Sequence, residues 1–349
     1  DQDRCLPTCD IITAYSHLQH SMYGYIRTIG ATITIPLLLF SGIPWFCVVE
    51  RRRYPQHAPG MLAFYFLVLA ISQTMSLSSN IDDVICKDHA IRNRDNSTMC
   101  RIQSYFYLLG TCCTATWWIA ININITVVVQ MTKSLSAFPL PVAVGVHILT
   151  LVPFVALAIQ GEIDGTMGGV NVVGICQLGS RSFKSWLPFT VATTSLVGVG
   201  LVTCLLCIGL LFYKKVYIFG PRGITEAVVE HRRIMLFQAI YFPIYLLPLV
   251  SSWYSVSRVD RYRDALNEYV ACTAQNRPDC DSPDILSWPL LFTQSIVNVI
   301  VLPLVVFMTI GNVGWVRRFW YKLLVNPRTA FKIENDGTSG TPGSSGQRS

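Results

Sequence analysis

Seven long apolar stretches alternate with polar segments along the chain, which has 349 residues. Each stretch is about 20 residues or longer, the length that a helix needs to cross the hydrocarbon core of a bilayer. We expect all seven to cross the membrane without Asp, Glu, Lys or Arg, because charged side chains are costly there. The pattern predicts an all-α membrane protein with a bundle of seven transmembrane helices. The predicted spans are Ile26–Val49, Pro59–Ile81, Ile102–Val129, Pro139–Gln160, Trp186–Phe212, Ile234–Tyr254 and Leu286–Gly311.

The third span carries polar residues that a lipid-facing helix would not tolerate. Its stretch TATWWIAININI, residues 114–125, places Asn122 and Asn124 about 200° apart around a helix. Both can find hydrogen-bond partners only if other helices surround this one, so we expect the third span to be central. Most uncharged polar residues of the spans are expected to join helices, with a ligand or ion path as the alternative. They are Gln73, Asn80, Asn122, Asn124, Gln238, Gln294 and Asn298.

Three segments outside the spans have patterns of their own. Short β-prone runs between glycines in GEIDGTMGGVNVVGICQLG, residues 161–179, predict a β-hairpin in the second outer loop. The segment GWVRRFWYKLL, residues 314–324, has an apolar and a basic face and predicts a short amphipathic eighth helix on the inner leaflet. The chain therefore divides into an extracellular hinge (1–25), the bundle (26–312), the amphipathic helix (313–325) and a disordered cytoplasmic tail (326–349).

The cysteines indicate which side of the membrane is outside. Five of the twelve fall within predicted spans and are expected to pack there, whereas the other seven all fall on the N-terminal side. Disulfides form in oxidising compartments, so we expect the N-terminus outside and the plasma membrane as location, with another endomembrane as the alternative. The glycosylation sequon at Asn96 lies on the same side. Because seven is odd, one cysteine is expected to pair upstream of residue 1.

The charge distribution makes the opposite face basic. The net charge is +7, and most acidic residues fall in the outer loops. The cytoplasmic face is therefore expected to meet anionic lipid or an acidic partner surface.

No catalytic or cofactor chemistry is expected from the residue pattern. The last span has no lysine that could bind retinal, and the six histidines are scattered along the chain. Clustered metal ligands, intramembrane carboxylates and a glycine-rich phosphate loop are missing from the sequence. We therefore expect a protein that is not an enzyme, holds no cofactor or metal, and has no nucleic-acid partner.

Five motifs in order resemble the Frizzled/Smoothened class (class F) of seven-helix receptors, and the similarity runs from Cys5 to Trp320. An arginine-rich turn before Tyr-Pro resembles the first inner loop, and a cysteine, an aromatic run and a Trp pair resemble the third helix. The remaining three resemble the second outer loop, the end of the sixth helix, and the stalk and cysteine pair of the third outer loop. The motifs are RRRYPQHAP (51–59), MCRIQSYFYLLG (99–110) with TATWWIAINI, GGVNVVGICQLG (168–179), PIYLLPLVSSWYS (243–255) and RYRDALNEYVACTA (261–274).

The resemblance implies a set of disulfides. Cys100 would tie the top of the third helix to Cys176, while Cys9 would join Cys86 and Cys272 would join Cys280. Cys5 would then pair upstream, in the hinge that follows the family's cysteine-rich ligand-binding domain.

Two departures from the family pattern concern the inner side. The family motif Lys-Thr-x-x-x-Trp, which helps recruit the adaptor Dishevelled, is reduced to IGNVGW, so that Trp315 remains. The basic residue and tryptophan that hold the family's inactive state align with Phe237 and Phe307, which predicts an aromatic pair as the switch. The expected cytoplasmic partner surface comprises Arg51, Arg52, Arg53, Arg232, Arg233, Trp315, Arg317 and Arg318.

These observations predict a divergent class F signalling receptor. It would pass an extracellular or lipid signal to a G protein or adaptor through movement of the sixth helix. The extracellular ligand would be a secreted protein, bound by a cysteine-rich domain, or a sterol. The alternatives are a transporter of small solutes or sterols, and a structural or trafficking protein on the same fold.

The orientation predicts glycosylation at Asn96 and none at Asn124, although both lie in sequons. Glycosidase treatment of the wild type should give one mobility shift on a gel, and Asn96→Gln should abolish it. A shift that persists in Asn96→Gln would show that the inside and outside have been assigned the wrong way round.

Overall fold

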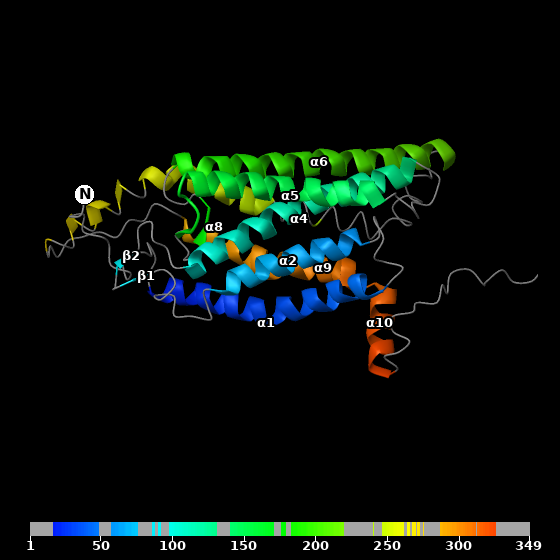
Figure 1. Ribbon diagram of the computed structural model, residues 1–349, viewed down its shortest axis with the longest axis horizontal. Coiled ribbons are helices and arrows are strands. Elements are labelled where there is room, and N and C mark those ends of the chain that lie inside the picture. The colour runs from blue at the N-terminus through cyan, green and yellow to red at the C-terminus, as the bar shows by residue number, and fades with distance from the viewer. Residues whose placement is uncertain are drawn as a thin grey trace, which may run out of the picture.

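The computed structural model shows long helices lying side by side along one axis (Figure 1). It describes residues 17–48, 57–75, 86–87, 90–91, 98–130, 140–170, 176–178, 183–219, 240, 246–261, 264–265, 267–269, 271–272, 275, 287–311 and 313–325. All structural statements below refer to these residues.

The helices follow the apolar stretches of the sequence. The long ones are α1 (His17–Cys47), α2 (Ala58–Thr74), α4 (Thr98–Gln130), α5 (Leu140–Ile163) and α6 (Phe183–Phe219). The last apolar stretch forms one continuous helical rod built of α8 (Trp288–Ile296), the π-helix η5 (Val297–Val301), α9 (Leu302–Val306) and the π-helix η6 (Phe307–Gly311). The final helix is α10 (Gly314–Val325). We call residues 288–311 the seventh-span rod.

Five helical segments of the described chain are long and apolar enough to cross a membrane: Met22–Cys47, Thr98–Val127, Pro141–Ile163, Trp186–Lys214 and Trp288–Gly311. They confirm five of the predicted spans. The second is a shorter apolar helix of 17 residues, α2. The sixth is described at residue 240 and from residue 246, where a helix continues to residue 261. The count of seven spans therefore stays a prediction.

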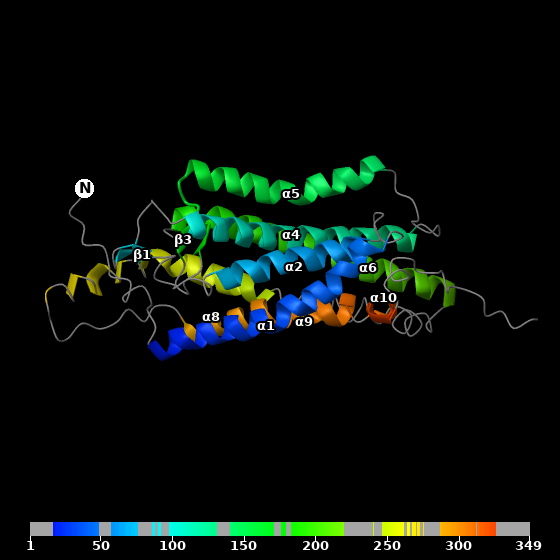
Figure 2. The ribbon, with the colours of Figure 1, turned by 60° about the horizontal axis from the view of Figure 1, so that its bottom comes forward.

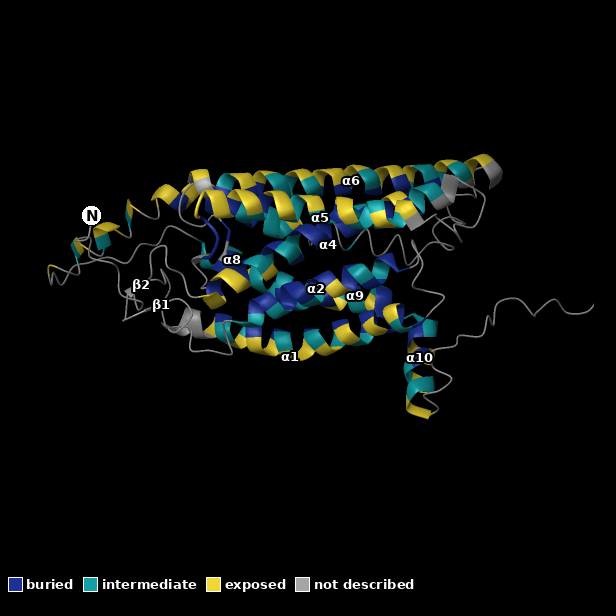
Figure 3. Ribbon diagram, viewed as in Figure 1, coloured by how far each residue is buried: buried dark blue, intermediate teal, exposed yellow. Residues whose placement is uncertain are grey.

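Helix α4 is the central helix, as the asparagines of the third span predict. It packs against α2, α5 and α6. Trp117, Trp118 and Asn122 are fully buried and Asn124 is 8% exposed. The Asn122 side-chain amide donates a hydrogen bond to the carbonyl oxygen of Gly200 in α6, at 3.4 Å. In Figure 3 the faces turned towards α4 are buried, whereas α1, α5 and α6 present exposed residues outward.

Helices approach closely where one of them has a glycine, which carries no side chain. A Cβ atom on Gly110 of α4 would lie 2.8–2.9 Å from the N, Cα and Cβ atoms of Leu69 in α2. A Cβ atom on Gly200 of α6 would lie 2.3 Å from the Trp118 ring. Small residues of this kind let helix backbones approach closely, and association within a bilayer relies on such packing.

Two short strand pairs lie outside the bundle. β1 (Cys86–Lys87) pairs antiparallel with β2 (Ala90–Ile91). β3 (Gly169–Val170) pairs antiparallel with β4 (Cys176–Gln177), with Gly169 opposite Gln177. The ladder lies in the predicted second outer loop, but residues 171–175 between the strands are outside the described residues, so the complete hairpin remains a prediction.

Helix α10 turns away from the bundle axis at the end where α1 finishes (Figure 1). Its buried residues Val316 and Phe319 face the bundle, and Phe319 forms an apolar cluster with Val48. Arg317 and Arg318 on the other side are exposed. The helix thus has the two faces expected of an amphipathic segment, and its contact with an inner leaflet stays a prediction.

We expect Gly110→Ala to lower the thermal unfolding midpoint of the purified protein in detergent. The added methyl group meets the Leu69 backbone, which cannot rotate away, and overpacking of this kind costs about 1–3 kcal/mol. Gly145→Ala in α5 is the matched control, because no atom lies within 4 Å of its Cβ position. That control should be neutral or stabilising by about 0.5–1 kcal/mol, since alanine favours a helix. Equal midpoints for the two variants would contradict the close contact of α2 and α4.

Candidate functional site

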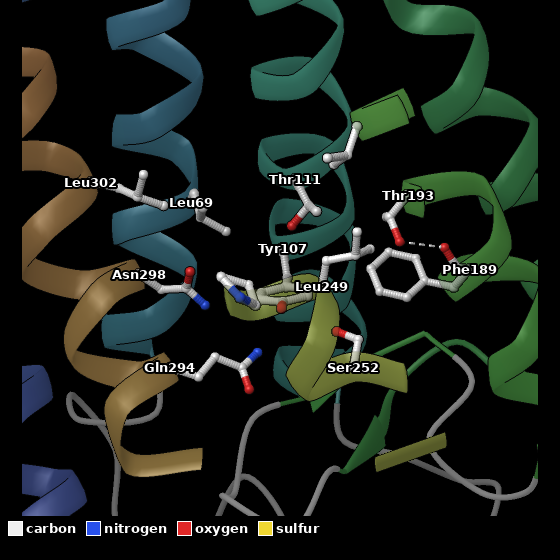
Figure 4. Close-up of a pocket in the computed structure, with 12 residues that line it drawn as sticks. Leu69, Tyr107, Thr111, Phe189, Thr193, Leu249, Ser252, Gln294, Asn298 and Leu302 are labelled. Carbon is white, nitrogen blue, oxygen red and sulfur yellow. Dashed lines mark hydrogen bonds between the residues drawn. The ribbon is translucent and has the colours of Figure 1, made fainter. Parts of the chain in front are cut away.

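A small cavity lies among α2, α4, α6, the helix at residues 246–261 and the seventh-span rod (Figure 4). Its volume is about 60 Å³. A water needs roughly 10–15 Å³ on this measure, so the cavity has room for about four waters. The residues that line it are Leu69, Tyr107, Thr111, Phe189, Thr193, Val197, Pro248, Leu249, Ser252, Gln294, Asn298 and Leu302.

Polar groups from four helical segments converge on the cavity. They are Tyr107 and Thr111 of α4, Thr193 of α6, Ser252 of the helix at 246–261, and Gln294 and Asn298 of the seventh-span rod. In Figure 4 Gln294 and Asn298 reach in from one side, and Phe189 and Thr193 bound the other. A mostly apolar wall with a few converging polar groups is the usual character of a small-molecule site.

Gln294 connects the seventh-span rod to the helix at 246–261 at the edge of the cavity. The Ser251 hydroxyl donates a hydrogen bond to Gln294 Oε1. Two residues after Ser251, the Trp253 indole donates to the Thr194 hydroxyl of α6 at 2.7 Å. Gln294 therefore joins helices, as expected for the polar residues of the spans, and also lines a cavity, which was the alternative interpretation.

The seventh-span rod leaves α-helical geometry beside the cavity. In η5 the Leu302 N–H donates to the carbonyl of Val297, five residues back, and Pro303 follows with no N–H of its own. Asn298 lies within this π-helical turn. Single π-helical turns inside α-helices occur frequently at functional sites. The sequence analysis did not predict this π-helix, although Pro303 is a signal for it that the sequence contains.

A disulfide and a buried glutamine hold the second outer loop over α4. Cys100 and Cys176 are bonded, with Cα atoms 5.3 Å apart, which is the pair that the resemblance implies. The buried Gln103 amide donates to Ser72 O in α2 at 2.8 Å, and its oxygen accepts the N–H of Cys176 at 3.3 Å. Gln103 thus bridges α2 and β4, a role that the sequence analysis missed.

The other predicted disulfides lie mostly beyond the described residues. Cys272 is disulfide-bonded, and Cys280, its predicted partner, is outside them. Cys86 begins β1, whereas Cys5 and Cys9 are also outside. The five cysteines that were expected to pack within spans form no disulfide: Cys47, Cys112, Cys113, Cys204 and Cys207.

An ion pair ties α5 to α4 at the same end of the bundle. Arg101 Nη2 lies 2.8 Å from both carboxylate oxygens of Glu162, and the Tyr105 hydroxyl donates to Glu162 Oε1. The two charged side chains are 51% and 39% exposed. Exposed pairs contribute about 0–1 kcal/mol, so this contact orients the helix ends more than it stabilises them.

One charged residue within a span was overlooked. Arg27 lies in the first predicted span and is only 2% exposed in α1, so the assumption of uncharged spans was wrong there. Tyr23, one turn earlier, packs edge-on against Trp288 and Phe292 of the seventh-span rod. A buried cation within a span is costly and usually functional or paired, and its position was readable from the sequence.

The predicted switch residue Phe307 contacts α1. Its ring centroid lies 5.9 Å from that of Phe40, and Phe40 stacks on Trp320 of α10 at 5.2 Å. The Trp320 indole also donates to Phe40 O at 2.9 Å. The partner expected for Phe307, Phe237, lies outside the described residues, so their contact stays a prediction.

Of the predicted cytoplasmic surface, the structure describes the part on α10. Trp315 packs edge-on against Trp45 at 4.7 Å, so it serves to dock α10 on α1. Arg317 and Arg318 are exposed. The remaining residues of that surface, Arg51, Arg52, Arg53, Arg232 and Arg233, are outside the described residues.

The helices and the cavity define a multi-pass helical membrane protein. The sequence matches the Frizzled/Smoothened family membrane region over residues 14–324, so the chain belongs to that family. It is also similar to "Frizzled/smoothened-like sans CRD protein E" of Dictyostelium discoideum, with 20% identity over 341 residues. That match covers 92% of this chain and 72% of the relative.

We expect Cys100→Ser to lower the thermal unfolding midpoint, because loss of a disulfide typically removes about 2–4 kcal/mol of stability. Cys47→Ser, at a cysteine that forms no disulfide, is the control and should change the stability by no more than about 0.5 kcal/mol. Mass spectrometry of unreduced peptides should recover residues 100 and 176 in one linked species from the wild type. Two free thiols in that measurement would contradict the disulfide.

Proposed function

We propose that the protein is a plasma-membrane signalling receptor of Frizzled/Smoothened type, with its N-terminus outside. A ligand at the cavity would move the sixth helix and thereby change how a cytoplasmic G protein or adaptor engages the bundle. The observation that carries this proposal is the hydrogen bond between Ser251 and Gln294. This hydrogen bond joins the sixth helix, which moves in the proposed mechanism, to the polar wall of the cavity.

The size of the cavity supports a mechanism that requires movement. Sites for drug-sized ligands occupy about 300–1,000 Å³, several times the present 60 Å³. A ligand of that class would fit only after a wall moves outward. Pro248 lines the cavity in the first described turn of the helix at 246–261, and we propose this helix as the wall that moves.

The ligand is proposed to bind within the bundle. The family resemblance implies a separate extracellular domain for ligand recognition, but the Dictyostelium relative is named as lacking that domain. By analogy we propose that the bundle itself recognises an extracellular small molecule or a lipid, a sterol included. A transporter would need a continuous polar path, and the described cavity with its space for a few waters supports a receptor better.

The inner face is proposed to bind both lipid and the signalling partner. Arg317 and Arg318 project from α10 into solvent, where they can meet anionic headgroups or an acidic protein surface. The arginines of the first inner loop and of residues 232–233 would extend this surface. Trp315 is turned to α1 and would act by holding α10 in place.

Leu249→Trp tests the proposal, because Leu249 lines the cavity and its indole replacement would fill the space and push the sixth helix outward. We expect ligand-independent signalling to rise several-fold, up to about tenfold for each 1.4 kcal/mol by which the open state is favoured. The measurement is activation of a panel of G proteins in cells by dissociation of labelled subunits, normalised to receptor at the cell surface.

Val250→Trp is the matched control, because the neighbouring Val250 is 51% exposed and lies on the outer side of the same helix. It should leave basal signalling unchanged. Equal effects of the two variants would refute the cavity as the signalling site. Absence of coupling to every G protein and adaptor tested, at normal surface expression, would refute the receptor proposal as a whole.

A further inference from the structure

Two histidines from different helices meet at the end of the bundle opposite the Cys100–Cys176 disulfide. His57 caps the N-terminus of α2, and His147 lies two turns into α5. Their Nε2 atoms are 2.9 Å apart and their rings are almost parallel, at 4°. His57 is 7% exposed and His147 is half-buried. Neither histidine has a role in the proposed receptor mechanism.

The Trp117 ring of α4 contacts both imidazoles. Its centroid lies 5.9 Å from that of His57 and 5.0 Å from that of His147, edge-on in each case. The pair is therefore enclosed where α2, α4 and α5 meet. Such a position limits hydration of the two rings and makes their protonation sensitive to each other.

The short distance between the nitrogens restricts the protonation states of the pair. One Nε2 must carry the hydrogen and the other must accept it, which two neutral imidazoles achieve as different tautomers. A first added proton can bind the Nδ1 of the donor ring and leave the bond intact. A second must bind the accepting Nε2, and two N–H groups would then face each other. The bond cannot survive that state.

The titratable side chains of α2, α4 and α5 can be placed relative to the pair. Within α2 the titratable side chain besides the cap is Tyr65, and in α4 the nearest is Cys113, which donates to Thr150 O at 3.6 Å. The acidic residue of α5, Glu162, is held by Arg101 at the far end of the helix.

Helix α5 is the element that the pair holds. Figure 2 shows α5 on the outside of the bundle, beyond α4. Ile148 and Leu149, next to His147, are 59% and 68% exposed. The hydrogen bond between His57 and His147 joins this outer helix to α2, across α4. Loss of the bond would release the first two turns of α5 from α2, at the end away from the Arg101–Glu162 ion pair, while Thr116 still donates to the Thr150 carbonyl at 3.0 Å.

We propose that His57 and His147 form a proton-operated switch that holds α5 to α2 while the pair carries at most one added proton, and releases α5 when acidification protonates both rings. The ligand of this site is the proton itself, and the switch acts independently of any ligand in the cavity. The proposal goes beyond the receptor function and does not require it.

The test compares thermal unfolding midpoints of the purified full chain at about pH 7.5 and about pH 5.5, either side of the ordinary titration of imidazole. His147→Gln is the main variant, because its amide can donate and accept a hydrogen bond at both pH values. We expect acidification to lower the wild-type midpoint by about 2–4 °C more than that of His147→Gln. His231→Gln, a histidine distant from the pair in sequence, should behave as the wild type.

Hydrogen–deuterium exchange supplies a second measurement, which reports on α5 directly. After correction for the intrinsic rate, peptides covering residues 140–151 of the wild type should lose protection at least about tenfold on acidification, equivalent to 1.4 kcal/mol of opening free energy. Peptides from α4 should not. If His147→Gln does not fold, His57→Gln takes its place, and it should abolish the loss of protection on acidification. Unchanged protection of residues 140–151, or the same loss in the glutamine variants, would overturn the proposal.

Discussion

The packing of α4 between α2, α5 and α6 is the constraint on which the rest of the structure depends. A helix that carries two tryptophans, two asparagines and several threonines at its core must satisfy every polar group from its neighbours, because a bilayer offers no water to them. Asn122 reaches the backbone of α6 at Gly200, where the absence of a side chain leaves room for Trp118. Thr116 reaches the backbone of α5 at Thr150, with 3.0 Å between the oxygens. Each surrounding helix is thereby fixed in register against α4.

The two ends of the bundle are held in chemically different ways. At one end a disulfide, an ion pair and the Gln103 bridge join α2, α4, α5 and β4. At the other, aromatic rings and an imidazole pair make the contacts. The disulfide at the first end is covalent, whereas the aromatic contacts at the second can rearrange at modest cost. The proposed movements of α5 and the sixth helix use this asymmetry, since one end can act as a fixed base.

Much of the fold could be predicted from the sequence, because membrane-spanning helices follow a strong length and hydropathy rule. The central position of α4 followed from the angular separation of Asn122 and Asn124. Arg27 could have been found by the same rule applied more strictly. The contact between His57 and His147 could not, since 90 residues separate them and the motif that contains His57 gives no sign of a partner in the fourth span. The cavity and the π-helical turn depend on packing among five segments, which no single stretch of sequence encodes.

The position at which α10 docks on α1 follows from a proline in α1, because proline has no backbone N–H. In a regular helix the carbonyl of Phe40 would accept the N–H of residue 44, but that residue is Pro44 and has none. The Trp320 indole donates to this same carbonyl. One proline thus leaves an acceptor vacant in the first helix, and a side chain 280 residues away in the chain fills it. Helix α10 can therefore dock at only one position along α1. A shift of a single residue in the connection after Gly311 would rotate the Trp320 indole by about 100° around the axis of α10 and leave the Phe40 carbonyl without its donor.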